Sequence, residues 1–165
     1  MYALKHSEGF TLIEVVLVVV IIGILSLVAV VTFDDNQAQT QYETLIRKLV
    51  SDVRYAQQLA MTSGKGTRVY IDQSNNRYYL KWEDGTFIKK PVGGEDFVVQ
   101  LGTAEFTRVQ ITGTAFAGGR LDFSRDGTPL NAGNAFTGNL TLVVLNDAKK
   151  VTIIAGTGYL RIGDN

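Results

Sequence analysis

The chain has 165 residues with sixteen basic and sixteen acidic side chains, so its zero net charge gives no general attraction to nucleic acid or anionic lipid. It has no cysteine, which excludes disulfides, thiolate metal sites and cysteine nucleophiles. Its single histidine is His6, so removal of the first residues would also exclude histidine-based triads and histidine-ligated zinc. We therefore expect no enzymatic activity, no cofactor and no bound metal.

Residues 15–33, VVLVVVIIGILSLVAVVTF, carry no charge. About 20 apolar residues in a helix span the hydrocarbon core of a bilayer, so this run predicts a transmembrane helix. A buried core helix would usually be shorter and amphipathic, and a secretory signal peptide would have a shorter apolar region. Lys5 precedes the run and Asp34 and Asp35 follow it, which predicts a cytoplasmic N-terminus and an external remainder.

The stretch GFTLIEVVLVVVIIGIL, which begins at Gly9, resembles the N-terminus of the type IV pilin family, including the pseudopilins of type II secretion. The resemblance implies that a prepilin peptidase cuts between Gly9 and Phe10 and methylates the new amine of Phe10. It also implies that Glu14, the fifth residue after the cut, pairs with a neighbouring subunit during filament assembly. Many major pilins have a proline late in the apolar run, and its absence here favours a minor subunit.

Helical periodicity continues into the polar region after the apolar run. Apolar residues recur at spacings of three and four along one stripe, which follows a period of 3.6 and so disfavours a coiled-coil seam. These residues are Tyr42, Leu45, Ile46, Leu49, Val53, Ala56 and Ala60. The opposite side carries Gln41, Lys48, Asp52 and Gln58. We expect one helix over 10–61, ended by Gly64 as a C-cap, whose stripe packs against a soluble head.

The spacing of apolar residues changes from a helical to a strand period at residue 67. Residues 67–82 predict a β-hairpin with Tyr78 and Trp82 facing inward and Tyr79 facing outward. Further strands are expected at 97–101, 107–112, 120–123, 140–145, 150–154 and 159–162, with a long polar loop over 126–139. The predicted fold is α+β: a long N-terminal helix, transmembrane in its first half, packed on an antiparallel β-sheet head. The predicted parts are a cleaved leader (1–9), a membrane and filament-core helix (10–33), an amphipathic helix (34–62) and a periplasmic head (63–165).

Three stretches of the head resemble minor subunits of the GspH/FimT type: LVSDVRYAQQLAMTSGKGTRVYID, LDFSRDGTP and GTGYLRI. The resemblance implies a minor subunit of a type IV pilus or of the type II secretion pseudopilus. Its partners would be the prepilin peptidase, other pilin or pseudopilin subunits and the inner membrane. The subunit would cross the inner membrane once, with a periplasmic head, before it enters the filament.

The alternative is a membrane-anchored periplasmic binding module, such as a FimT-like minor pilin that binds DNA during uptake. The candidate DNA-binding residues are Lys149, Lys150 and Arg161. Acidic residues are interleaved with these basic positions, so a mixed solvated surface is the default interpretation and nucleic acid is not the expected partner. Three aspartates are candidate calcium ligands, but their spacing matches no EF-hand loop, so no metal site is expected: Asp122, Asp126 and Asp147.

Overall fold

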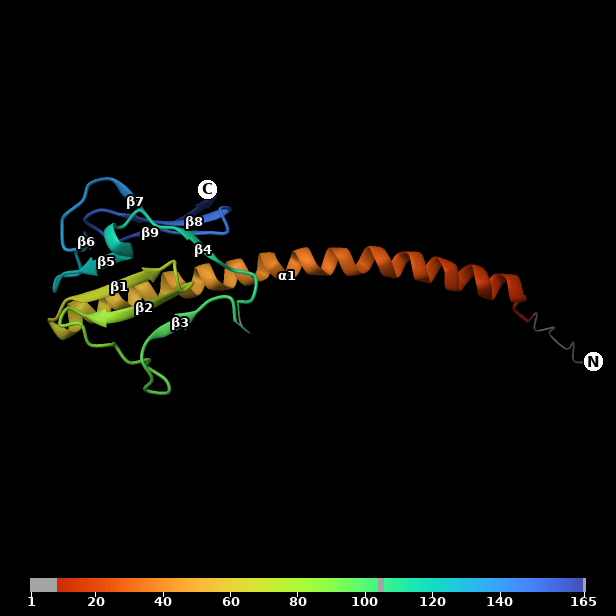
Figure 1. Ribbon diagram of the computed structural model, residues 1–165, viewed down its shortest axis with the longest axis horizontal. Coiled ribbons are helices and arrows are strands. Elements are labelled where there is room, and N and C mark those ends of the chain that lie inside the picture. Colours follow the sequence, from red (N-terminus) through yellow and green to blue (C-terminus); the bar gives the residue numbers. More distant parts are fainter. Residues whose placement is uncertain (1–8, 104–105, 165) are drawn as a thin grey trace, which may run out of the picture. The chain divides into compact units, whose positions relative to one another are not determined.

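The computed structural model of the chain describes residues 9–103 and 106–164, except for the side chains of residues 27–39. Its first element is α1 (Leu12–Ser63), which begins in the unit Met1–Gln37 and ends in the compact unit Ala38–Asn165, here called the head (Figure 1). Both ends of α1 lie within two residues of the predicted 10–61. Gly64 follows with a φ of +66°, a left-handed conformation that terminates the helix as predicted.

The β-strands of the head form two antiparallel sheets (Figure 1). The five-stranded sheet has the order β3-β2-β1-β5-β6 and contains β1 (Thr67–Asp72), β2 (Arg77–Trp82), β3 (Val98–Gln100), β5 (Arg120–Phe123) and β6 (Pro129–Asn131). The four-stranded sheet has the order β4-β7-β8-β9 and contains β4 (Ile111–Gly113), β7 (Asn139–Leu145), β8 (Lys149–Ile154) and β9 (Leu160–Asp164). The short 3-10 helix η1 (Ala117–Gly119) precedes β5.

The core of the head forms where the apolar stripe of α1 meets both sheets. Six of the seven predicted stripe residues are buried, and Tyr42 is partly buried against the same core. Residues of α1 and of both sheets surround a residual cavity of only about 10 Å³. Its lining includes Leu45 and Leu49 from α1, Ile71 and Tyr78 from one sheet, and Val143 from the other. A void of that size holds at most one water molecule, so the three layers are closely packed.

Asp52 does not lie on the solvated side of α1, where the sequence pattern placed it. The residue is 9% exposed, and Tyr78 Oη donates a hydrogen bond to Asp52 Oδ2 at 2.6 Å. Lys48 Nζ lies 3.2 Å from the same oxygen. A buried carboxylate needs such partners because an unpaired charge is costly in the interior. The hydrogen bond between Tyr78 and Asp52 therefore connects α1 to β2 at the border of the apolar stripe.

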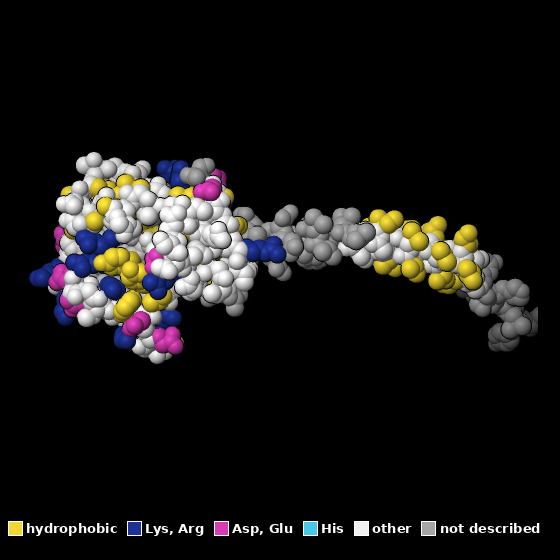
Figure 2. Space-filling view, viewed as in Figure 1, with side chains coloured by type: hydrophobic (Ala, Val, Ile, Leu, Met, Phe, Trp, Pro, Cys, Tyr) yellow, Lys and Arg dark blue, Asp and Glu magenta, His cyan; other side chains and the backbone are white. Residues whose placement is uncertain are grey.

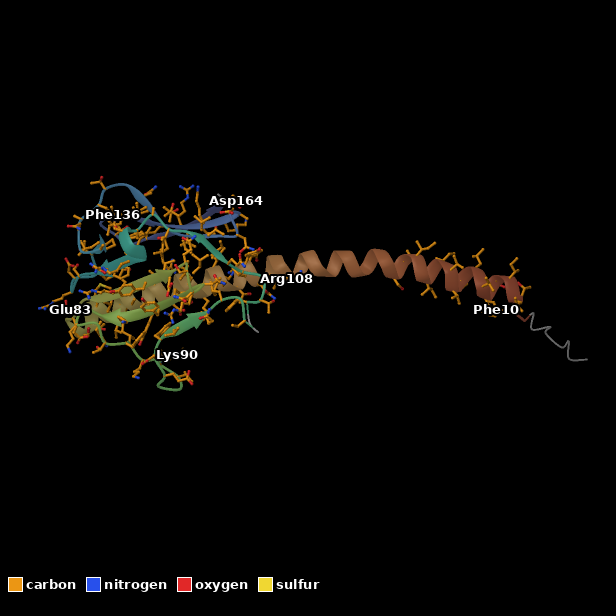
Figure 3. All side chains as sticks on the ribbon, viewed as in Figure 1. Phe10, Glu83, Lys90, Arg108, Phe136 and Asp164 are labelled. Carbon is orange, nitrogen blue, oxygen red and sulfur yellow. The ribbon has the colours of Figure 1, made fainter. Side chains whose placement is uncertain are left out.

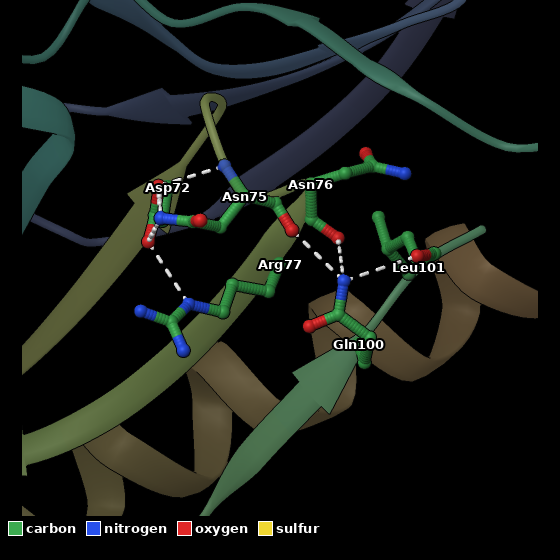
Figure 4. Close-up of polar contacts among 6 residues, drawn as sticks. All are labelled: Asp72, Asn75, Asn76, Arg77, Gln100 and Leu101. Carbon is green, nitrogen blue, oxygen red and sulfur yellow. Dashed lines mark hydrogen bonds and ion pairs between the residues drawn. The ribbon is translucent and has the colours of Figure 1, made fainter. Parts of the chain in front are cut away.

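The turn between β1 and β2 connects the two sheets through Asn76. Asn76 Nδ2 donates to the carbonyl oxygen of Val109 at 3.1 Å, and Asn76 Oδ1 accepts from the backbone N–H of Ile111 at 2.8 Å. On its other side the turn is held by Gln100 Nε2, which donates to the carbonyl oxygens of Asn75 and Asn76 (Figure 4). The side chain of one turn residue thus fixes the five-stranded sheet to the start of β4.

Two of the predicted assignments, one strand and one loop, are wrong for different reasons. The expected strand over 107–112 is mostly loop, because a turn at 106–109 interrupts it and β4 begins only at Ile111. The expected loop over 126–139 contains β6, which pairs with β5 at the edge of the sheet. Pro129 opens β6, and proline is tolerated at the first residue of an edge strand. The hairpin 67–82 is confirmed, with Tyr78 buried and Tyr79 on the opposite face.

Tyr78→Phe should destabilise the head, because it removes the hydroxyl that donates to buried Asp52. Loss of a partner for a buried charged group costs roughly 1–3 kcal/mol. Urea unfolding, followed by the fluorescence of Trp82, the only tryptophan of the chain, measures the change. Tyr79→Phe is the matched control, since Tyr79 lies on the outer face of the same strand. An equal loss of unfolding free energy in Tyr78→Phe and Tyr79→Phe would contradict a stabilising role of the Asp52 contact.

Gly119→Ala should destabilise the head strongly. Gly119 has a φ of +65°, and a Cβ built there lies 2.3 Å from the carbonyl oxygen of Ile71, so the backbone of β1 or η1 must move. Gly118→Ala provides a neighbouring control with a similar φ of +60° but nothing within 4 Å of the added Cβ. The free energy of unfolding of the control should fall by only roughly 1–2 kcal/mol, which is the cost of a left-handed conformation for alanine. Thermal unfolding that shows the same shift in both variants would refute the close contact.

Candidate functional site

The N-terminal end of α1 is capped by Thr11. The backbone N–H of Glu14 lies 3.1 Å from the Thr11 carbonyl oxygen and 3.3 Å from Thr11 Oγ1. The N–H of Val15 also donates to the Thr11 carbonyl oxygen, at 3.3 Å. A threonine in this position typically stabilises a helix start by about 1 kcal/mol. Thr11 is not among the predicted site residues, although the spacing Thr-x-x-Glu is typical of a capping box.

The predicted cleavage site lies just ahead of this cap. Gly9 and Phe10 are outside the helix and exposed to solvent, and Phe10 is 82% exposed (Figure 3). Exposed segments that lack backbone pairing are the usual sites of proteolysis. A cut between Gly9 and Phe10 would therefore place a new amine next to the first turn of α1 without breaking a helical hydrogen bond.

Glu14 lies in the first turn of α1, where the helix macrodipole favours a negative charge. It borders an open hollow of about 250 Å³ whose lining is otherwise apolar. Phe10, Val15, Val18 and Val19 form the rest of that lining. Phe10 precedes α1, although the predicted helix over 10–61 included it. Phe10 and Glu14 share one hollow, which leaves space beside the carboxylate.

The surface around Glu14 is apolar on every side of the helix. The large hydrophobic side chains from Leu12 to Leu25 are between 46% and 83% exposed (Figure 2). Glu14 is the only charged residue from 9 to 26. The predicted membrane segment, 15–33, extends into residues whose side chains lie outside the described part of the structure. Among the described residues, no helix combines the length and apolarity required to cross a membrane.

The three candidate DNA-binding residues do not form a single patch. Lys149 pairs with Asp164 in the register of β8 and β9, and the two side chains form an ion pair. Lys150 and Arg161 lie on the opposite face of the four-stranded sheet, since they alternate with buried Val151 and Leu160. The charge of Lys149 is therefore already neutralised by Asp164, and the side chains of Lys150 and Arg161 lie on the other face of the sheet.

Two of the three aspartates considered as calcium ligands, Asp122 and Asp126, have other roles. Asp122 lies 3.0 Å from Arg120 Nε, and Asp126 accepts hydrogen bonds from Ser124 and Thr128 within its own turn. Those hydrogen bonds, led by that of Ser124, lower the pKa of Asp126. In the described part of the chain, no three acidic or histidine side chains converge as a metal site would require.

Two family models match the chain. The prokaryotic N-terminal methylation motif matches residues 4–30, which include Gly9, Phe10 and Glu14. The family described as type II transport protein GspH matches residues 45–158, which cover most of the head. The two matches thus cover different parts of the chain, one at its N-terminal end and one over most of the head.

Individual relatives include two proteins of Pseudomonas aeruginosa named fimbrial protein. One is 30% identical over 126 residues, which are 74% of this chain and 81% of the relative. The other is 32% identical over 85 residues, 52% of this chain and 54% of the relative. The solved structure of the minor pseudopilin EpsH from the type 2 secretion system of Vibrio cholerae is similar with a TM-score of 0.48 and 16% identity. That similarity covers 74% of this chain and 95% of that chain.

The family matches agree with the exposed apolar helix start and the β-rich head. The GspH model covers more than half of the chain, and the methylation motif covers the residues around the predicted cut. The chain therefore belongs to the type II transport protein GspH family and is a minor pseudopilin- or pilin-like protein that carries the N-terminal methylation motif.

Proposed function

We propose that this chain is a structural minor subunit of a type IV filament, either a pilus or the pseudopilus of type II secretion, with no catalytic role. The exposure of apolar side chains all around the start of α1 supports this proposal most directly. A helix that is hydrophobic on every side requires an apolar environment on every side. Lipid supplies that environment before assembly, and the packed helices of neighbouring subunits supply it in the filament.

The single carboxylate in this apolar surface specifies the position of the subunit. A charge near the centre of a bilayer costs about 2.5–3.5 kcal/mol on insertion scales, and Glu14 lies near one end of the apolar run, where the cost is lower. In a filament its partner is the methylated amine of a neighbouring subunit, which enters the hollow beside Glu14. An out-of-register subunit would leave Glu14 buried without a partner, at a cost of roughly 3–5 kcal/mol.

The processing and the location of this chain follow from the same proposal that it is a filament subunit. The prepilin peptidase removes residues 1–9 and methylates Phe10, so the new amine lies immediately before the Thr11 cap. Residues 10–33 hold the subunit in the inner membrane with its N-terminus in the cytoplasm, and the head is periplasmic. The protein partners are the peptidase and the other pilin or pseudopilin subunits.

Glu14→Gln should reduce incorporation of the subunit into filaments by on the order of tenfold or more, because it removes the charge that pairs with the neighbouring amine. The amount of subunit in sheared filaments is compared with the amount in the membrane fraction. Membrane insertion should be unchanged, since the variant makes the segment more apolar.

Glu43→Gln is the matched control for Glu14→Gln. Glu43 is an exposed glutamate on the same helix, within the head. It should retain the filament level of the unchanged chain. If Glu14→Gln entered filaments as efficiently as Glu43→Gln, charge pairing at Glu14 would play no part in assembly.

Gly9→Val should block processing and leave the fold intact. A Cβ built at Gly9 has no neighbouring atom within 4 Å, so the substitution has no steric effect on the rest of the chain. Mass spectrometry of the membrane fraction should show N-methylated Phe10 as the first residue of the unchanged chain and the intact leader in the variant. Detection of an unmodified Phe10 or of another N-terminus in the unchanged chain would contradict the proposed cut.

A further inference from the structure

One face of the five-stranded sheet points away from the core and combines aromatic with basic side chains. The strand alternation that buries Val69 and Leu80 turns their neighbours outward. Figure 2 shows hydrophobic side chains over β1 and β2 with Lys and Arg around them. We call this surface the aromatic–basic face, and its defining residues are Arg68, Tyr70, Tyr79, Lys81, Phe87 and Arg120.

The rings of this face form a cluster with a cation over it. Tyr70 and Tyr79 are opposite one another on β1 and β2, and their rings stack with a centroid distance of 4.9 Å and an interplanar angle of 12°. The centroid of Phe87 lies 5.8 Å from that of Tyr79. Lys81 Nζ lies 4.5 Å from the Phe87 centroid and 5.6 Å from the Tyr79 centroid. Cross-strand ring pairs and cation–π contacts of this kind each stabilise a sheet by roughly 1 kcal/mol or less.

The charges of the face are not arranged for stability alone. Arg68 and Lys81 are direct cross-strand partners, and like charges in that position destabilise a sheet. Within the described part of the chain, the contacts of Lys81 are with rings and it forms no ion pair. Arg68 Nε is 4.0 Å from Asp122 Oδ1, the same oxygen that Arg120 Nε approaches to 3.0 Å. Two guanidinium groups thus share one carboxylate, which leaves positive charge unbalanced.

An open groove begins where this face ends. It has a volume of about 630 Å³, and its charged lining residues are Arg68, Glu83, Asp122, Arg125 and Asp126. Arg125 is paired with Glu83 at 3.2 Å, so the groove does not share the positive surplus of the face. Asp122 is 7% exposed. Its Oδ1 atom makes no hydrogen bond among the described residues, so its contacts with Arg68 and Arg120 are ion pairs. Burial raises the pKa of Asp122, while Arg120 and Arg68 oppose that rise. A carboxylate that lay on the aromatic–basic face would meet the guanidinium of Arg68, for which Asp122 is a distant partner.

We propose that the aromatic–basic face is a docking surface for an acidic segment of another protein. Carboxylates of that segment would pair with Arg68 and Lys81, and its apolar side chains would cover Tyr70 and Tyr79. Arginine and tyrosine are the residue types that most often dominate binding energy at protein interfaces. Charge complementarity selects the partner, because the surplus of the face is positive.

Two other occupants fit the same surface less well. Bases of single-stranded nucleic acid need free ring faces, but Tyr70 and Tyr79 stack on each other and Lys81 lies over the cluster. A second copy of this chain would present the same positive charge to Arg68 and Lys81, so face-to-face pairing of two copies is unfavourable.

Binding can be measured by fluorescence anisotropy on the full chain in non-ionic detergent micelles. Three labelled probes are compared: a peptide in which Glu alternates with Leu, the same peptide with Lys in place of Glu, and a thymidine oligonucleotide of equal charge to the first. We expect the acidic peptide to bind, the basic peptide not to bind, and the affinity to fall as salt increases. The double variant Arg68→Glu, Lys81→Glu should weaken binding of the acidic peptide about tenfold or more.

The double variant Lys150→Glu, Arg161→Glu is the control with the same change in net charge. Both of its residues lie on the four-stranded sheet, so it should bind the acidic peptide like the unchanged chain. Circular dichroism of both double variants verifies that each is folded, and Tyr79→Ala tests the surface without a change of charge. The proposal is overturned if the acidic peptide does not bind, if both double variants weaken it equally, or if the oligonucleotide binds more tightly than the peptide. Self-association through this face, detected as a dimer that the Arg68 and Lys81 changes dissociate, would overturn it as well.

Discussion

Burial of one apolar stripe on α1 is the constraint on which the head depends. Each sheet has one apolar face, and neither sheet alone could remove that face from water. The stripe, which includes Leu45, Leu49 and Val53, supplies the surface against which both sheets pack, and the cavity among the three layers is nearly closed. Contacts at the border of the stripe, such as Tyr78 with Asp52, then fix how α1 lies against β2.

The N-terminal part of the same helix carries a second apolar surface. Side chains from Leu12 to Leu25 are exposed all around, and Glu14 is the only charge among them. The two parts of α1 thus differ. The head buries one stripe within the chain, whereas the apolar side chains of the N-terminal part are exposed, which supports the proposal that lipid or other subunits surround them. This difference fits the proposed role of one continuous helix in both a folded domain and a filament. The Thr11 cap defines where that helix starts, immediately after the proposed cut.

The two faces of the five-stranded sheet serve different purposes, and adjacent residues on β2 illustrate this. Tyr78 points inward, where it is 2% exposed and bonded to Asp52. Tyr79 points outward, where its ring stacks on Tyr70 beneath the ammonium of Lys81. The inner face serves to pack the core, since it is apolar apart from a few polar groups that have hydrogen-bond partners. The outer face instead keeps a like-charge pair and a shared carboxylate that a merely solvated surface would not require, which is why we assign it to recognition.

Local patterns in the sequence determined the features that depend on neighbouring residues. The helical stripe, the hairpin 67–82, the Gly64 stop and the motif around Gly9 and Glu14 could all be predicted, because period, turn chemistry and motif spacing are properties of short segments. Only the tertiary structure decided the division into two sheets, the short edge strand β6, the burial of Asp52 and the meeting of Arg68 with Asp122 and Arg120. These features depend on strand pairings between distant segments, and the free energy of such pairings comes from the shared core rather than from the residues of either segment.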